Sequence, residues 1–142
     1  MSSGGKVTAF LVFQFGVVLV VLLVTALRPG PWDGIRVIGF LIALFGTVML
    51  FLARYQIGDS FTVSPQARRL VTHGVYSRIR NPIYVFGPIL IAGLALYWNR
   101  SYFLWAFAFL IPMQAWRARK EARVLEVKFG EDYRTYRRQT WF

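Results

Sequence analysis

The chain has 142 residues, of which 56% are hydrophobic and 18% aromatic. Soluble domains average roughly 45–50% apolar residues, so this composition predicts one all-helical integral-membrane domain over residues 1–142. The 17 basic residues outnumber the 6 acidic ones, but they lie between and after the apolar runs, which favours anionic lipid headgroups and excludes nucleic acid as a partner. With no cysteine and one histidine, no protein-built metal site is expected, and any cofactor should be organic.

Four uncharged apolar runs predict four transmembrane helices. A helix needs roughly 20 apolar residues to cross the hydrocarbon core, and shorter runs cross where the bilayer thins. The expected spans are residues 7–27, 37–53, 83–98 and 101–116. Gly39, Gly46 and Thr47 offer small surfaces for close packing of the second span. Pro88 and Pro112 are expected to bend the third and fourth spans.

The longest connection between spans is residues 54–82, which we expect to form a loop. Its turn-forming residues predict an irregular path with one short helix near residues 66–70. In contrast, only Asn99 and Arg100 separate the third span from the fourth. The last two spans should therefore form a tight antiparallel hairpin.

The tail, residues 117–142, is predicted to be helical. Good helix formers continue the fourth helix to Lys128, and Gly130 is a suitable stop. A short basic helix that carries Tyr133 and Tyr136 should follow.

The distribution of arginine and lysine predicts the orientation. The loop and the tail hold most of the basic residues outside the spans, whereas the other two connections hold only Arg28, Arg36 and Arg100. Because basic connections face the cytoplasm, both termini, the loop and the tail are expected there.

Polar residues gather where the loop meets the third span and where the fourth span ends. Pro82 suits the first position of a helix, and Arg117 and Glu121 lie four residues apart on one face of the fourth helix. A carboxylate here suits an ammonium group, an arginine or a helix N-terminus suits a carboxylate, and tyrosine rings suit a sulfonium or an adenine. The candidate cofactor-binding residues are Tyr76, Arg80, Asn81, Tyr84, Arg117 and Glu121, and no catalytic residue is assigned.

A plainer interpretation of the same residues stays open at this point. Arg78 and Arg80 could anchor the chain at the lipid headgroups, with the tyrosines as part of an interfacial belt. Arg117 and Glu121 could form an ordinary ion pair on a solvated helix, worth roughly 0.2–0.5 kcal/mol.

The order and spacing of these residues resemble a known superfamily. Gly74-x-Tyr76-x-x-x-Arg80-Asn81-Pro82-x-Tyr84 is followed, after a hairpin, by Arg117-x-x-x-Glu121-Ala122-x-x-Leu125-x-x-x-Phe129-Gly130-x-x-Tyr133-x-x-Tyr136. This pattern is similar to that of the isoprenylcysteine carboxyl methyltransferases and phospholipid methyltransferases. The resemblance implies an integral-membrane enzyme that binds S-adenosylmethionine at the cytosolic ends of its last helices and methylates a lipid-like or small amphipathic acceptor.

Two positions depart from the superfamily's pattern. Asn81 stands where a histidine is frequent, and an amide cannot shuttle protons near neutral pH. Ala122 replaces the second of two frequent glutamates, so capture of the cofactor would depend on Glu121. The one histidine, His73, lies outside the motif position, and we expect it to be structural or exposed.

Two other functions remain as alternatives. The membrane steroid reductases resemble the same motifs and bind a nicotinamide cofactor, which makes an NADPH-dependent reductase the second enzyme hypothesis. The departures at Asn81 and Ala122 leave a non-catalytic membrane scaffold as the third.

Overall fold

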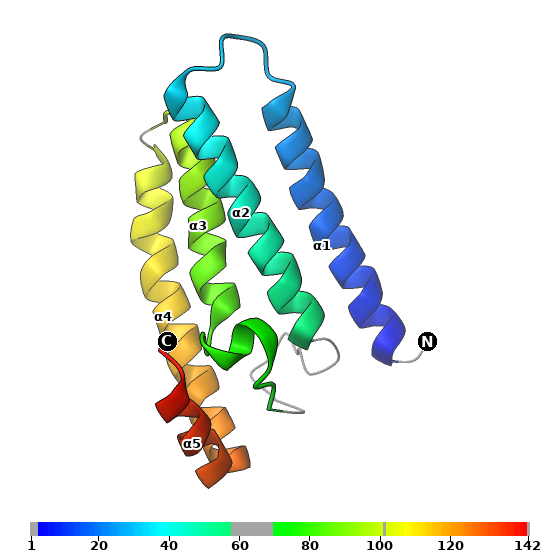
Figure 1. Ribbon diagram of the computed structural model, residues 1–142, viewed down its shortest axis with the longest axis vertical. Coiled ribbons are helices and arrows are strands. Elements are labelled where there is room, and N and C mark those ends of the chain that lie inside the picture. The colour runs from blue at the N-terminus through cyan, green and yellow to red at the C-terminus, as the bar shows by residue number, and fades with distance from the viewer. Residues whose placement is uncertain (1–2, 58–69, 101, 142) are drawn as a thin grey trace.

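The computed structural model describes residues 3–57, 70–100 and 102–141, and every regular element in these residues is helical (Figure 1). Two observations follow at once: the all-α class is confirmed, and the helices match the apolar runs closely. The elements are α1 (Ser3–Ala26), α2 (Gly34–Ile57), the 3-10 turn η2 (Gly74–Ser77), α3 (Pro82–Trp98), α4 (Tyr102–Phe129) and α5 (Glu131–Gln139).

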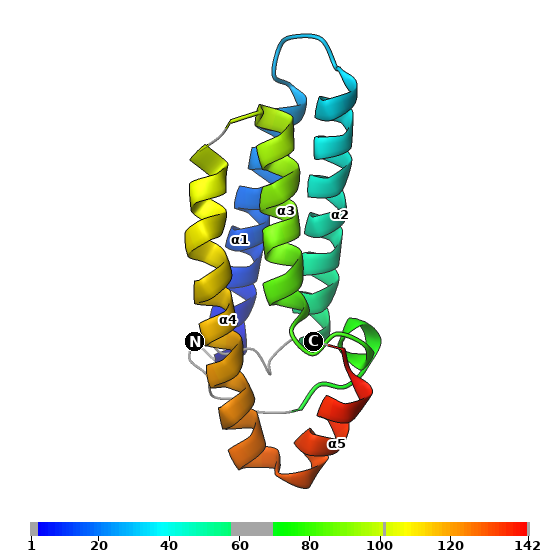
Figure 2. The same ribbon diagram turned by 90° about the vertical axis from the view of Figure 1, so that its left-hand side faces the viewer.

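The four long helices lie side by side, each antiparallel to the one before it (Figures 1 and 2). The connection from α1 to α2 and the hairpin from α3 to α4 lie at one end of the bundle. The N-terminus, η2 and α5 lie at the other end, where α4 extends beyond its neighbours and α5 folds back beside it. The described part of the basic loop, with η2, therefore shares one end of the bundle with the basic tail, as their sequence positions predict.

Several predicted boundaries are confirmed and others are extended. The hairpin turns at Asn99, which adopts a left-handed φ of 46°, and Gly130 ends α4 with a φ of 53°. The helix expected near residues 66–70 lies outside the described residues. Both Pro88 and Pro112 lie inside helices that continue through them.

Among the described residues, α2 is the helix long and apolar enough to cross a membrane. Two shorter apolar helical stretches, Val12–Ala26 and Pro82–Trp98, accompany it. The membrane-length element is thus at the centre of the bundle, with apolar helices beside it (Figure 1).

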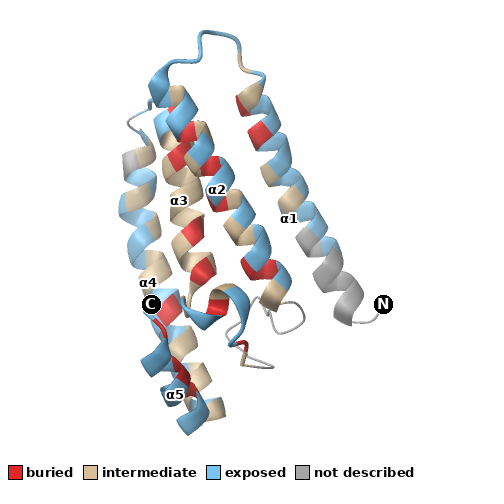
Figure 3. Cartoon of the chain, viewed as in Figure 1, coloured by how far each residue is buried: buried red, intermediate tan, exposed pale blue. Residues whose placement is uncertain are grey.

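The tightest contact in the bundle joins α2 to α3 through small residues. A Cβ added at Gly39 would lie 2.5 Å from the Tyr97 backbone nitrogen, and one at Gly46 would lie 2.7 Å from the Leu90 nitrogen. Gly93 of α3 faces the Ala43 backbone just as closely. The close packing expected of Gly39 and Gly46 is confirmed, and Figure 3 shows the resulting row of buried positions.

A polar cluster joins three helices at the end of the bundle away from η2. Tyr97 of α3 is 2% exposed, donates its hydroxyl to the Thr25 carbonyl of α1 and accepts a hydrogen bond from Arg36 Nη2 of α2 (2.7 Å). The Arg36 guanidinium also lies 4.8 Å from the centre of the Tyr97 ring. Because the Tyr97 hydroxyl donates to α1 and accepts from α2, the cluster links α1, α2 and α3, although Arg36 Nε is buried without a hydrogen-bond partner in the described part of the chain.

Candidate functional site

The segment before α3 is held in place by the end of α2. Gly74 has a φ of +61°, a conformation that L side chains rarely adopt, and it begins η2. The next amide, of Val75, donates to Gln56 Oε1 of α2 (2.7 Å). As a result Tyr76 is 6% exposed and packs in an apolar cluster with Ala53 and Val71.

Three candidate residues occupy the start of α3. Pro82 is the first residue of the helix, as its fixed φ favours, and Asn81 is the N-cap. The Asn81 carbonyl accepts the amide of Tyr84 (3.1 Å), while its side chain makes no capping hydrogen bond. The amide side chain of Asn81 is therefore not used to start the helix, and Arg80 lies just before it.

Glu121 of α4 meets α3 across the helix pair. The Tyr84 hydroxyl donates a hydrogen bond to the Glu121 carboxylate. Burial raises the pKa of Glu121, and this hydrogen bond and the charge of the exposed Arg117 partly oppose the rise. The Glu121 carboxylate thus has a hydrogen-bond partner on α3, which the alternative of an Arg117–Glu121 ion pair within one solvated helix does not include.

The helix α5 closes the site from a third direction. Tyr133 is 0% exposed and Tyr136 is 5% exposed. Tyr136 donates its hydroxyl to the carbonyl of Tyr76 in η2 (2.7 Å), and the Trp141 amide donates to the Arg78 carbonyl (2.9 Å). These bonds hold α5 against the segment that carries the candidate residues.

The turn from α4 to α5 is itself fixed by charge. Arg134 of α5 donates to Glu126 of α4 (3.0 Å) and to Glu131 (2.6 Å). Gly130 supplies the left-handed backbone that the turn requires. These four residues lie at the turn where α5 returns toward the bundle (Figure 2).

Burial raises the pKa values of the Tyr76, Tyr133 and Tyr136 hydroxyls. The nearby charge of Arg80 opposes the rise in pKa at Tyr133 and Tyr136, and that of Glu121 adds to it at Tyr76. All three hydroxyls therefore stay protonated at neutral pH and act as hydrogen-bond donors.

Some buried polar atoms of the site have no hydrogen-bond partner within the described part of the chain. They are the Tyr76 hydroxyl, the Tyr133 hydroxyl and Arg80 Nε. An unsatisfied buried donor costs roughly 1–3 kcal/mol, so folded proteins rarely keep several together without a reason. Tyr76 and Tyr133 are close enough to Glu121 for its charge to act on their hydroxyls, so these unpaired atoms make this end of the bundle a candidate site for a polar ligand.

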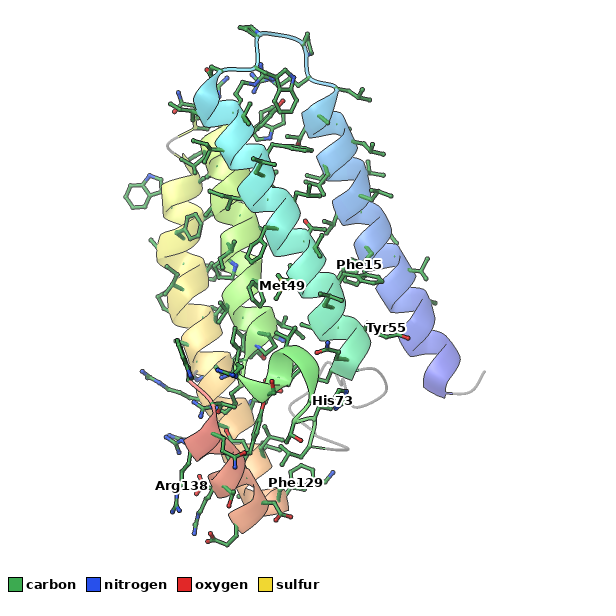
Figure 4. The ribbon with its side chains drawn as sticks, in the orientation of Figure 1. Phe15, Met49, Tyr55, His73, Phe129 and Arg138 are labelled. Carbon is green, nitrogen blue, oxygen red and sulfur yellow. The ribbon has the colours of Figure 1, made fainter. Side chains whose placement is uncertain are left out.

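The structure brings most of the candidate residues into one cluster. The acidic end of this cluster consists of Glu121 with its neighbours Tyr76, Tyr84 and Arg117. Arg80 lies with Tyr133 and Tyr136 at a basic end, and Asn81 stands beside it at the start of α3. His73 is exposed, and Figure 4 shows it on the side of η2 away from α5.

Some residues of the site were not predicted. Tyr133 and Tyr136 were expected on a short basic helix and in the superfamily motif but were not predicted to bind the cofactor, although their spacing of three residues puts them on one face. Arg54 of α2 is 3% exposed, donates to Gln14 Oε1 of α1 (2.7 Å), and its charge reaches the Tyr76 hydroxyl. No local signal in the sequence marks Gln56 or Arg54 as neighbours of the site.

An all-helical bundle around an apolar helix of membrane length is the architecture of a membrane-associated helical protein, and the candidate residues gather at the end of the bundle that carries η2 and α5. The family model described as phospholipid methyltransferase matches residues 35–132, and the chain belongs to this methyltransferase family. The match includes η2, α3 and α4 and ends just before Tyr133. No curated protein and no solved structure matches the chain.

Proposed function

We propose that the protein is an integral-membrane methyltransferase that uses S-adenosylmethionine to methylate a lipid-like or small amphipathic acceptor at the cytoplasmic membrane face. The observation that supports this most directly is the two-ended site, with the carboxylate of Glu121 at one end and the guanidinium of Arg80 at the other. Because the chain belongs to a methyltransferase family, the two ends suit the ammonium and the carboxylate of a methionine-derived methyl donor.

The residues of the site fit the cofactor's functional groups. Glu121 would accept hydrogen bonds from the ammonium of the methionine moiety, and Arg80 would bind its carboxylate. The rings of Tyr76 and Tyr84 offer negative faces to a sulfonium cation, and the free amide of Asn81 can orient a polar edge. The unsatisfied atoms Arg80 Nε and Tyr76 Oη would gain partners on binding.

The bound sulfonium supplies a methyl group together with its own leaving group, so the protein mainly has to hold donor and acceptor in line and exclude water. Tyr76 and Tyr133 are almost completely buried and would help to exclude water from the bound donor. Neither the raised pKa of the tyrosine hydroxyls nor the amide of Asn81 suits a general base at neutral pH. We therefore assign positioning roles to these residues and no proton acceptor.

The membrane arrangement in this proposal has four spans with both termini in the cytoplasm. At 1.5 Å per residue, the 28 residues of α4 measure about 42 Å, longer than the roughly 30 Å hydrocarbon core. The 17 residues of α3 measure about 26 Å, which requires slight thinning. The part of α4 with Arg117 and Glu121 would then lie at the headgroups, where the acceptor's polar end lies.

Ligand binding to the purified protein in detergent tests the proposal. We expect S-adenosylmethionine and S-adenosylhomocysteine to raise the unfolding temperature, and radiolabelled methyl groups to move from S-adenosylmethionine into extracted membrane lipid. Stabilisation by NADPH alone would contradict the proposal in favour of the reductase. No stabilisation by any of the three ligands would favour the scaffold.

A further inference from the structure

Two buried tyrosines on α5 differ in the hydrogen bonding of their hydroxyls. Tyr133 and Tyr136 are both almost completely buried, and their ring centres lie 6.3 Å apart. The hydroxyl of Tyr136 donates to the Tyr76 carbonyl (2.7 Å), whereas that of Tyr133 has no hydrogen-bond partner among the residues the structure describes. One hydroxyl therefore contributes to the fold, and the other is buried without a structural role.

The surroundings of the Tyr133 hydroxyl indicate what it can bind. The charge of Arg80 acts on it most strongly, and those of Arg137, Glu121 and Glu126 also reach it. Arg80 Nε is buried nearby and, like the hydroxyl, lacks an acceptor in the described ranges. Within these ranges both donors are buried without an acceptor, and the charge of one acts on the other, which suits an anionic oxygen.

We propose that the Tyr133 hydroxyl and Arg80 Nε together bind one anionic group of the ligand, which is the carboxylate of the methionine moiety if the ligand is S-adenosylmethionine. This inference rests on the proposed function and extends the site onto α5. Tyr133 belongs to the motif that resembles the superfamily, but its role is argued from its burial and from its hydroxyl, which is unpaired among the described residues.

Removal of the Tyr133 hydroxyl should have opposite effects on the stability of the unliganded protein and on its affinity for the ligand. A buried hydroxyl without a partner destabilises the unliganded protein, so its removal should leave the fold unchanged or more stable. The same removal should weaken binding because a donor to a charged oxygen is lost. A hydroxyl with a structural partner behaves in the opposite way, which makes Tyr136 the matched control.

The experiment compares the parent with Tyr133→Phe and Tyr136→Phe in detergent. Without ligand, Tyr133→Phe should unfold at the same or a higher temperature than the parent, and Tyr136→Phe at a lower one. In calorimetric titration, Tyr133→Phe should bind S-adenosylhomocysteine about ten- to a hundredfold more weakly than the parent. Binding of 5′-methylthioadenosine, which lacks the amino-acid group, should not change.

Arg80→Gln tests the same subsite from its other side. It should weaken S-adenosylhomocysteine binding without affecting 5′-methylthioadenosine, and the loss in the double variant with Tyr133→Phe should be smaller than the two single losses combined. Equal binding by Tyr133→Phe and the parent, or a lower unfolding temperature like that of Tyr136→Phe, would overturn the inference. If the parent itself binds no S-adenosylhomocysteine, the proposed cofactor is wrong, and the inference falls with it.

Discussion

Replacing Glu121 with glutamine should separate the stability of the protein from its affinity for the cofactor. Glutamine has almost the same volume and keeps a carbonyl oxygen that can accept the Tyr84 hydroxyl, so the contact between α3 and α4 survives. What disappears is a negative charge that burial penalises.

The pH dependence follows from the direction of the pKa shift. Burial raises the pKa of Glu121, so the folded state holds this proton more tightly than the unfolded state, in which a glutamate titrates near 4.3. The free energy of unfolding therefore falls as the pH rises from about 4.3 through the raised pKa, and the loss is complete above it. At pH 7 the unliganded Glu121→Gln variant should be at least as stable as the parent, and the difference should vanish below pH 4 or so.

The effect on binding has the opposite sign. If Glu121 accepts hydrogen bonds from the ligand's ammonium, the variant loses a charge-assisted hydrogen bond worth roughly 1.5–3 kcal/mol. The dissociation constant of S-adenosylhomocysteine should then rise about ten- to a hundredfold.

Calorimetric titration and thermal unfolding of the same samples measure both effects. The control is Asp132→Asn, which also removes one negative charge but from an exposed side chain at the start of α5. Equal affinities in the parent and both variants would remove Glu121 from the site. A lower unfolding temperature of unliganded Glu121→Gln at pH 7 would refute the argument from burial.

Three further predictions concern the loop, the turn and the topology. Asn81→Ala should weaken cofactor binding and leave the shape of any pH–rate profile unchanged. Its loss of unfolding free energy should be smaller than the about 1 kcal/mol typical of an N-cap substitution, because the Asn81 side chain makes no capping hydrogen bond. Gly74→Ala should lower stability by about 1–3 kcal/mol in chemical unfolding, since φ is +61° and the new Cβ would collide with the Gln56 side chain; unaltered stability would contradict this. Single cysteines at the exposed Arg100 and Gln139 should report opposite sides of the membrane, and labelling of Gln139→Cys from outside intact cells would overturn the orientation.

The helices were largely predictable because their determinants are local. Prolines, glycines and charges mark the ends of apolar runs, and so the hairpin at Asn99 and the stop at Gly130 are both confirmed. The end of α2 was placed too early, at residue 53, although the helix continues to Ile57. An apolar run marks only the uncharged part of a helix, whereas Arg54 and Gln56 are polar residues that a helix accepts readily.

The assembly of the site was only partly predictable because it depends on contacts between distant segments. The Arg117 and Glu121 pair was visible as helix spacing, but the hydrogen bond from Tyr84 requires the register of α3 against α4. The contacts of Tyr133 and Tyr136 further require α5 to fold back, which the turn at Gly130 decides. Sequence spacing alone predicts neither the register of α3 against α4 nor the direction in which α5 folds back.

The glycine contact between α2 and α3 determines how this chain can diverge during evolution. Even one extra methyl group at Gly39 or Gly93 would meet backbone atoms, which no rotamer change can relieve. Most of the described side chains of α1 and many of those on α4 are instead exposed on the outside of the bundle, where one apolar residue can replace another without a steric clash (Figure 3). Such a protein can exchange much of its apolar sequence and keep its fold, provided that the small residues between α2 and α3 and the polar cluster around Tyr97 are kept.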